Sequence, residues 1–140
     1  MGSMTESLIR YLIIMKKVHR SWGWWSVLAE YDKSCKIKEL VVDPQAKLSW
    51  QRHEFRSELW FVRKGTATIY YSDDKEGAKN VFKVTKVEKQ IQRISRYQWH
   101  CLANETNKEL SIIEIQFGDD CRESDITRKQ LPRGDYLFSD

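Results

Sequence analysis

Three things that this chain lacks narrow its class. Among 140 residues it has only 3 cysteines, and Cys35, Cys101 and Cys121 stand far apart and odd in number, which favours a reducing compartment over a disulfide framework. It has no apolar run approaching the roughly 20 residues of a membrane span, since the segment "LIRYLIIMKK" is interrupted by Arg10. It shows no targeting signal, so we expect a cytoplasmic protein without a membrane partner.

A strong excess of one charge is also missing. The chain carries 24 basic and 20 acidic residues, a formal net charge of +4, with no basic stripe. A nucleic-acid-binding domain presents clustered basic side chains, so we expect no nucleic-acid partner. The small positive excess is compatible with an anionic small-molecule substrate.

The composition is that of one globular domain. Hydrophobic residues make up 41% of the chain and aromatic residues 12%, enough to build a core at this length. We interpret residues 1–18 as a tag remnant and an N-terminal arm, whose apolar part is an extra strand or a short helix. Residues 19–128 are the expected barrel, and residues 129–140 the expected C-terminal tail.

Short β-type runs separated by turn residues fill the chain, and only 2 prolines interrupt it. The pattern predicts eight to ten strands and almost no helix. Gly65 is expected to mark a tight hairpin, and residues 122–129 to make one helical turn capped by Ser124 or Asp125. So many short strands need their edges removed, which predicts an all-β closed barrel or a double-sheet jelly roll. The predicted strands lie in residues 22–31, 35–43, 47–53, 57–65, 66–74, 80–95, 99–105 and 110–118.

Metal-binding side chains gather in the stretch "LSWQRHEFRSELWFVRKG". Strand side chains alternate faces, so Gln51 and His53 point the same way, and the strand that follows can bring Glu58 back over them. His100, much later in the chain, is the candidate for a fourth donor. One amide oxygen, two imidazoles and one carboxylate suit zinc, manganese, iron or nickel.

The spacing of these donors resembles the two motifs of the cupin superfamily. Gln51, His53, Glu58 and Gly65 match the first motif, Gln-x-His-x4-Glu-x6-Gly, and His100 with Asn104 matches the second. Longer stretches, such as "VVDPQAKLSWQRH" and "ESDITR", resemble the C-terminal isomerase domain of bifunctional mannose-6-phosphate isomerase/mannose-1-phosphate guanylyltransferase enzymes. The similarity runs from about His19 to Arg128 and implies a single cupin-type jelly-roll barrel.

That resemblance implies a metal-dependent aldose–ketose isomerase converting mannose 6-phosphate to fructose 6-phosphate. Gln51, His53, Glu58 and His100 would hold a divalent metal, zinc by similarity to phosphomannose isomerases, which polarises the sugar carbonyl and hydroxyl. Arg128, in "DITR", matches the Arg of the family's Asp-Ile-Val-Arg and would bind the phosphate. Arg52 and Arg56 are secondary candidates for that role. The residue that moves the proton is not assigned.

Departures from the family pattern keep other functions open. The chain reads "HEF" where the family has three histidines, Leu59 replaces a common His, and Ser95–Tyr97 replaces Pro-x-Gly. The alternative is a non-catalytic cupin that binds a metal and a sugar, or acts as a partner subunit. A metal-dependent oxygenase is a third hypothesis, which the leading Gln of the donor set disfavours. We also expect a homodimer.

Overall fold

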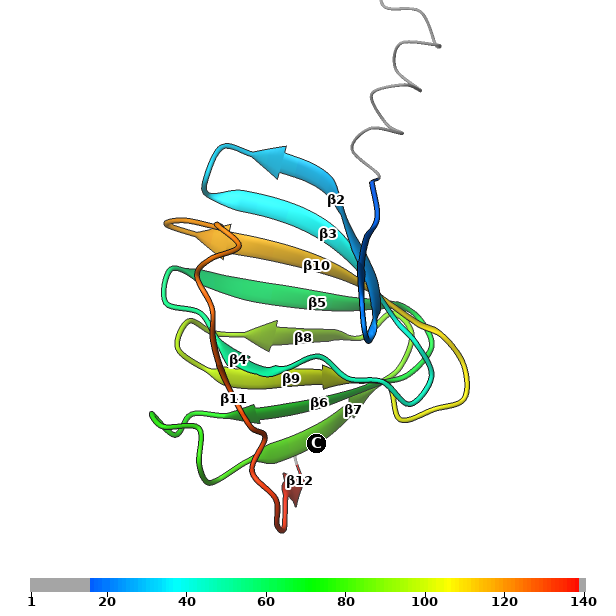
Figure 1. The fold of residues 1–140 in the computed structure, drawn as a ribbon, viewed down its shortest axis with the longest axis vertical. Coiled ribbons are helices and arrows are strands. Elements are labelled where there is room, and N and C mark those ends of the chain that lie inside the picture. The colour runs from blue at the N-terminus through cyan, green and yellow to red at the C-terminus, as the bar shows by residue number, and fades with distance from the viewer. Residues whose placement is uncertain (1–15, 139–140) are drawn as a thin grey trace, which may run out of the picture.

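A computed structural model describes residues 16–138 of the chain (Figure 1). It contains twelve strands and no helix in that range, where the sequence predicted eight to ten strands and almost no helix. No helix able to cross a membrane is therefore found among these residues. The apolar part of the N-terminal arm, residues 8–15, lies outside the described residues.

The strands form two antiparallel sheets apart from one parallel pair at an edge. The first sheet contains, in spatial order, β1 (Val18–Arg20), β2 (Gly23–Tyr31), β3 (Cys35–Val42), β10 (Leu110–Gly118), β5 (Arg56–Lys64) and β8 (Ile91–Ile94). The second contains β11 (Thr127–Lys129), β4 (Trp50–Arg52), β9 (Trp99–Ala103), β6 (Ala67–Ser72), β7 (Phe82–Lys86) and β12 (Leu137–Phe138). The predicted strands over 22–31, 35–43 and 110–118 are β2, β3 and β10.

The core lies between the two sheets, because alternate side chains of each sheet turn inward. Its fully buried members include Val42 and Ile112 from the first sheet and Ile69 and Leu102 from the second. A second apolar cluster covers the opposite face of the second sheet, where Trp50 stacks against Trp99 with ring centroids 6.0 Å apart. Two layers with a shared apolar interior are the jelly-roll arrangement that the sequence predicted.

Gly65 does not close a hairpin. It follows β5 and precedes β6, which pair with different neighbours and belong to different sheets. The chain passes from one sheet to the other there, with Gly65 at a φ of 90°. A Cβ at this position would lie 2.7 Å from the backbone oxygen of Glu109, so the close crossing requires glycine.

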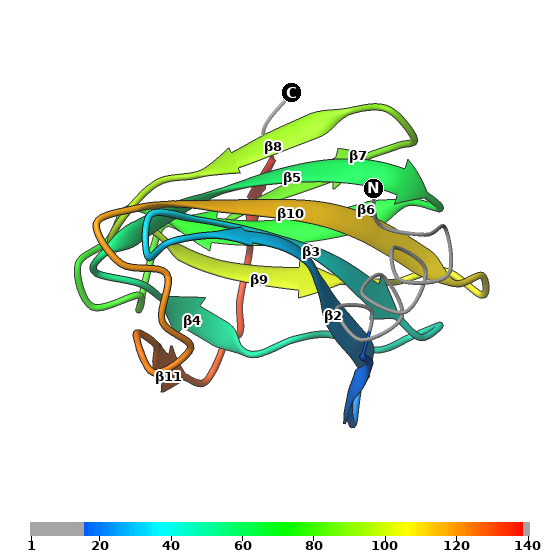
Figure 2. The ribbon, with the colours of Figure 1, turned by 90° about the horizontal axis from the view of Figure 1, so that it is seen from above.

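The helical turn predicted over residues 122–129 is also wrong. Residues 119–129 form a non-helical segment, hereafter the strap, which turns at Glu123–Ser124, crosses the ends of both sheets and finishes as β11 beside β4 (Figure 1; Figure 2). The Asp125 carboxylate accepts hydrogen bonds from the backbone N–H groups of Glu54 and Phe55, each at 2.9 Å. The carboxylate therefore satisfies backbone N–H groups of the bend that follows His53, and it does not cap a helix that begins at Asp125.

Candidate metal centre

Three of the four predicted metal ligands converge in the interior. One donor atom each from His53, Glu58 and His100 can be chosen so that all lie within 4.8 Å of one another. The residues are only 2%, 2% and 1% exposed. His53 follows β4, His100 lies on β9 of the same sheet, and Glu58 lies on β5 of the facing sheet. The cluster therefore spans the gap between the two sheets.

Backbone carbonyls fix the orientation of both imidazoles. Nδ1 of His53 lies 2.7 Å from the Asp125 carbonyl oxygen, and Nδ1 of His100 lies 2.8 Å from that of Gln98. A carbonyl oxygen only accepts, so each Nδ1 must carry the proton. Both Nε2 atoms then remain as the ring positions that face Glu58 and can coordinate a metal. Such outer hydrogen bonds are what orient histidine ligands in metal sites.

The Glu58 carboxylate joins the two histidines. Its Oε1 lies 3.1 Å from Nε2 of His100 and 3.5 Å from Nε2 of His53. Burial opposes ionisation of Glu58 most strongly, but the adjacent imidazoles of His53 and His100 outweigh it and hold the pKa of this carboxyl well below its usual range. An ionised carboxylate between two imidazoles is a chemically suitable donor set for a divalent cation.

A buried nitrogen without a hydrogen bond gives an independent test of that fit. Although His100 Nε2 is near Glu58, the angles do not make a hydrogen bond, and this atom has no other partner among the described residues. Buried polar atoms left unpaired are costly in a folded protein. A metal ion coordinated by Nε2 would satisfy it, so the residues fit the group that the motifs imply.

Gln51, the fourth predicted ligand, lies beside this cluster. It pairs with His100 across β4 and β9, and its side chain lines the same pocket as Glu58. Its amide nitrogen donates weakly to Ser49, with distances of 3.4 Å to the carbonyl and 3.3 Å to the hydroxyl. The amide oxygen makes no hydrogen bond within residues 16–138. Its role as a ligand stays a prediction.

Arg56 is the cation nearest to the donor set. Its Nε lies 3.4 Å from Glu58 Oε2 and its Nη2 lies 3.4 Å from His53 Nε2, while Nη1 donates to the carbonyl of Arg122. Burial by itself would lower the pKa of Arg56, but the charges of Glu58 and Glu114 raise it above its usual value. From the sequence, Arg56 was a secondary candidate for binding the phosphate. In the structure it lies at the floor of the pocket described next.

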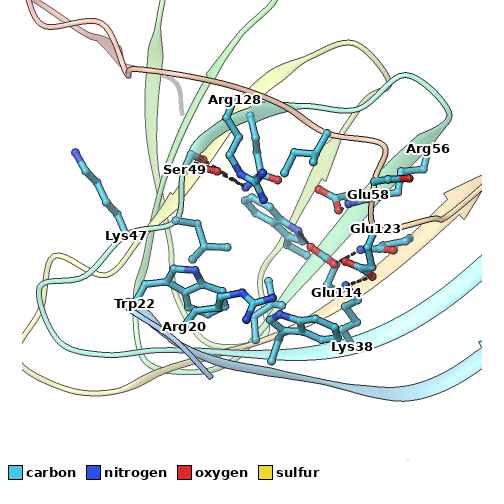
Figure 3. Close-up of a pocket in the computed structure, with 18 of the residues that line it drawn as sticks. Arg20, Trp22, Lys38, Lys47, Ser49, Arg56, Glu58, Glu114, Glu123 and Arg128 are labelled. Carbon is cyan, nitrogen blue, oxygen red and sulfur yellow. Dashed lines mark hydrogen bonds and ion pairs between the residues drawn. The ribbon is translucent and has the colours of Figure 1, made fainter. Parts of the chain in front are cut away.

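One pocket of about 760 Å³ opens onto the candidate metal centre (Figure 3). Its floor carries Glu58, Arg56 and the carboxyl of Glu114, and its rim carries side chains from β1 and from the strap. Figure 3 shows that these residues come from both sheets and meet across the opening. The pocket is lined by Arg20, Ser21, Trp22, Trp25, Lys38, Leu40, Lys47, Leu48, Ser49, Gln51, Arg56, Glu58, Trp60, Glu114, Gln116, Glu123, Ser124, Ile126 and Arg128.

Sequence reasoning missed Glu114, a second buried carboxyl on the floor. One oxygen accepts a hydrogen bond from Trp60 Nε1 at 2.9 Å and the other from Gln116 Nε2 at 2.7 Å. Burial, with the nearby charge of Glu58, raises the pKa of Glu114 to about 7, although Lys38 and other neighbours oppose the rise. The sequence "IIEIQFG" contains the signal that could have identified it. Glu114 and Gln116 are two residues apart and therefore share one face of the strand, opposite to Ile113 and Ile115.

Sequence reasoning also missed two lysines on β3, whose side chains lie on the inward face of an otherwise largely apolar strand. Lys36 and Lys38 are 8% and 4% exposed, and both form ion pairs with Glu123 of the strap, at 3.2 and 2.5 Å. Lys38 also lies 4.0 Å from the ring centroid of Trp25. These contacts attach the strap to the first sheet, beside the pocket.

The three arginines considered for anion binding lie in different places. Arg128 pairs with Gln51 across β11 and β4 and lines the pocket. Arg52 does not line it; this side chain pairs with Glu54 at 3.4 Å and lies 5.8 Å from the ring of Tyr97. That outward direction is the one strand alternation predicted. Arg56 lies deeper, at the donor set.

The positions where the chain departs from the family motif lie outside the pocket lining. Glu54 and Phe55 are exposed, the latter by 43%. Leu59 alternates with Glu58 on β5 and pairs with Ile115 on β10, on the outer face of the first sheet. These changes therefore remove no donor atom from the cluster.

Two antiparallel sheets closed around a pocket, with histidine and carboxylate donors meeting inside, define a cupin. Comparison with known protein families agrees with this assignment. Residues 10–130 match the family described as mannose-6-phosphate isomerase C-terminal, and the chain belongs to that family.

Curated relatives that resemble this chain are longer proteins. A mannose-1-phosphate guanylyltransferase of Salmonella muenchen is 34% identical over 121 residues, 86% of this chain and 24% of that protein. Alginate biosynthesis protein AlgA of Pseudomonas aeruginosa is 37% identical over 112 residues, 80% of this chain and 21% of that protein. The chain thus spans less than a quarter of the length of either relative.

Solved structures share the fold. The capsular polysaccharide assembling protein CapF of Staphylococcus aureus superposes with a TM-score of 0.72 at 11% identity, over 82% of this chain and 34% of that one. Oxalate decarboxylase of Bacillus subtilis gives 0.70 at 11% identity, over 81% and 30%. A cupin superfamily protein of Desulfitobacterium hafniense gives 0.57 at 16% identity, over 74% and 84%. At these identities the likeness concerns the fold alone.

Proposed function

We propose that this chain is a divalent-metal-dependent aldose–ketose isomerase that interconverts mannose 6-phosphate and fructose 6-phosphate. The observation that carries the proposal is the buried cluster of His53, Glu58 and His100, whose carboxylate residue, Glu58, lines a single pocket. Membership of the mannose-6-phosphate isomerase C-terminal family supports the substrate class. The pocket volume, about 760 Å³, accommodates a hexose phosphate.

The metal site uses side chains that are already oriented for it. His53 and His100 offer Nε2 lone pairs, Glu58 offers a carboxylate oxygen, and Gln51 offers an amide oxygen from the adjoining strand. A divalent ion held there, for which zinc is our candidate, supplies Lewis-acid polarisation of the sugar carbonyl and its neighbouring hydroxyl. Arg56 adds a fixed positive charge to the same floor.

Aldose–ketose isomerisation also requires a group that moves a proton between the first and second carbons of the open-chain sugar. Glu114 suits this task by its position, because its carboxyl lines the pocket and forms no ion pair among the described residues. Hydrogen bonds from Trp60 and Gln116 hold both of its oxygens in place. At the rim, Arg128 provides a cation for the phosphate.

A non-catalytic cupin that binds a metal and a sugar is the alternative. The changes that favoured it in the sequence, at Glu54 and Phe55 and in the segment Ser95–Tyr97, lie off the pocket lining. They therefore give no structural reason for lost turnover, and we favour the isomerase.

The deciding experiment measures metal content and turnover on the same purified protein. We expect bound zinc and interconversion of mannose 6-phosphate and fructose 6-phosphate, with both abolished by His53→Ala. His19→Ala is the matched control, because His19 is the one histidine of the chain outside the proposed metal site and lies exposed on β1. Bound metal without turnover on hexose phosphates would leave the non-catalytic alternative, and oxygen consumption with iron would favour the oxygenase.

A further inference from the structure

The charged side chains of the pocket are separated by depth. All three acidic residues of its lining are engaged: Glu58 by the two histidines and Arg56, Glu114 by Trp60 and Gln116, and Glu123 by Lys36 and Lys38. Arg56 and Lys38 are thus matched by carboxylates. Three further cations of the lining, Arg20, Lys47 and Arg128, form no ion pair within residues 16–138. The rim of the pocket therefore carries uncompensated positive charge.

Arg20 and Arg128 approach the opening from opposite walls. Arg20 ends β1 at the edge of the first sheet, and Arg128 lies on β11 at the edge of the second. Figure 3 shows both side chains extending into the pocket, while Lys47 extends outward at its margin. Nη1 of Arg20 donates a hydrogen bond to the carbonyl of its neighbour His19, which leaves the rest of the guanidinium for a ligand.

Two guanidinium groups that face one space without a counter-charge favour an anion between them. Guanidinium forks match the geometry of phosphate oxygens, and such bonds are stronger than neutral ones. A doubly charged group satisfies both arginines better than a single carboxylate does. The floor, by contrast, offers Glu58 of the candidate metal site and the carboxyl of Glu114, which suit uncharged sugar oxygens.

We propose that Arg20 and Arg128 together bind the phosphate monoester of the substrate, so that this group bridges the edge strands β1 and β11 of the two sheets. The inference rests on the proposed function for the identity of the sugar. It adds Arg20, which the sequence did not single out, and it assigns the direction of the ligand. The phosphate lies at the rim and the reacting carbons lie toward Glu58.

The bridge has a structural consequence. β1 and β11 are both three-residue edge strands, each joined to its sheet by three paired residues. Short edge strands open more readily than central ones. An anion bound to Arg20 and Arg128 links the two edges, so we expect the amides of residues 18–25 and 127–129 to exchange more slowly when phosphate is bound.

The test compares Arg20→Gln and Arg128→Gln with Arg93→Gln. Arg93 is the matched control because it is also exposed and forms no ion pair in the described part of the chain, but lies on β8, outside the pocket lining. Calorimetric titration of the zinc-loaded protein uses fructose 6-phosphate, fructose and inorganic phosphate as separate probes. We expect each pocket variant to weaken fructose 6-phosphate binding on the order of tenfold or more, with Arg93→Gln unchanged.

Several outcomes decide the matter. Binding of fructose by Arg20→Gln as by the unaltered protein, together with weaker binding of both phosphate probes, supports the proposal. Unchanged affinity for fructose 6-phosphate in Arg20→Gln overturns it, as does amide exchange in residues 18–25 that phosphate does not slow. Arg20→Lys keeps the charge but loses the fork, and we expect an intermediate affinity.

This inference and the proposed function can fail separately. If the unaltered protein binds fructose 6-phosphate through Arg20 and Arg128 but does not interconvert the sugars, the isomerase proposal is wrong and the anion site stands. If it turns over and Arg20→Gln leaves the Michaelis constant unchanged, the isomerase stands and the anion site is wrong. Lys47→Gln, at the margin, is expected to have a smaller effect than either arginine variant.

Discussion

The imidazole of His53 donates its Nδ1–H to the backbone carbonyl of Asp125, 2.7 Å away. The carboxylate of Asp125 also accepts hydrogen bonds from the backbone N–H groups of Glu54 and Phe55. Asp125 thus holds both the ring of His53 and the bend that follows it, although it lies on the strap, far along the chain. The orientation of one candidate metal ligand depends on a segment that contains no ligand itself.

Asp125→Ala is therefore expected to weaken metal binding without removing a ligand. The substitution keeps the Asp125 carbonyl that accepts from His53 but removes the carboxylate that fixes the bend after His53. Disturbing the outer support of a metal-binding histidine lowers metal affinity by up to about 10- to 100-fold, and two unpaired backbone N–H groups lower the free energy of unfolding by roughly 1–3 kcal/mol. Zinc titration and urea unfolding measure the two effects. The control is Asp119→Ala, since Asp119 forms only an exposed ion pair with Arg96. Equal zinc affinity in both variants would contradict the role of Asp125.

The buried carboxyl of Glu114 predicts how stability of the metal-free protein depends on pH. Burial raises the pKa of Glu114 to about 7 from a usual value of 4.5, so the folded state holds this proton more tightly than the unfolded state does. The stabilisation is complete at low pH and is lost as the pH rises from about 4.5 to about 7, by about 3 kcal/mol at most. Glu114→Gln removes this dependence, and urea unfolding at a series of pH values measures it. The exposed Glu109→Gln should keep it; an identical pH profile in Glu114→Gln would refute the assignment.

Replacing Gly77 by a larger residue is expected to disturb packing on the far face of the second sheet. It has a φ of 65°, its carbonyl accepts a hydrogen bond from Trp50 Nε1, and a Cβ there would lie 2.6 Å from the ring of Trp99. We expect Gly77→Ala to lower the free energy of unfolding by about 1–3 kcal/mol. Gly134→Ala is the control, because Gly134 also has a positive φ but nothing within 4 Å of the added carbon. Equal losses in the two variants would show that backbone conformation, not the tryptophan contact, determines the cost.

The homodimer expected from the sequence stays a prediction, and the structure suggests where to test it. On β10, the residues that alternate with the pocket side chains face outward: Ile115 pairs with Ile37 and Leu59, and Ile113 pairs with Phe61. An apolar sheet face of this kind is typical of subunit contacts. Light scattering at micromolar concentration should give twice the chain mass of 16.7 kDa, and Ile115→Lys should reduce it. A monomer mass for the unaltered protein would contradict the prediction.

Much of this protein could be predicted from local sequence patterns. Alternation of side chains identified the long strands and the facing of Gln51 relative to Arg52, because a strand's two faces follow from its own backbone geometry. The motif spacing pointed to His53, Glu58 and His100. The same pattern was present but not recognised at Glu114 and Lys38, polar residues on the inward face of otherwise apolar strands.

What the sequence by itself determined was which residues form the longer strands and which of their side chains share a face, since both depend on neighbours along the chain. The tertiary structure alone decided that Glu58 reaches the histidines from the opposite sheet, that Gly65 lies where the chain crosses between sheets, and that residues 119–129 form a non-helical strap beside the pocket. Strand pairing and the path of the strap depend on contacts between residues far apart in sequence, which alternation does not specify. Arg20 and Arg128 meet at one rim for the same reason.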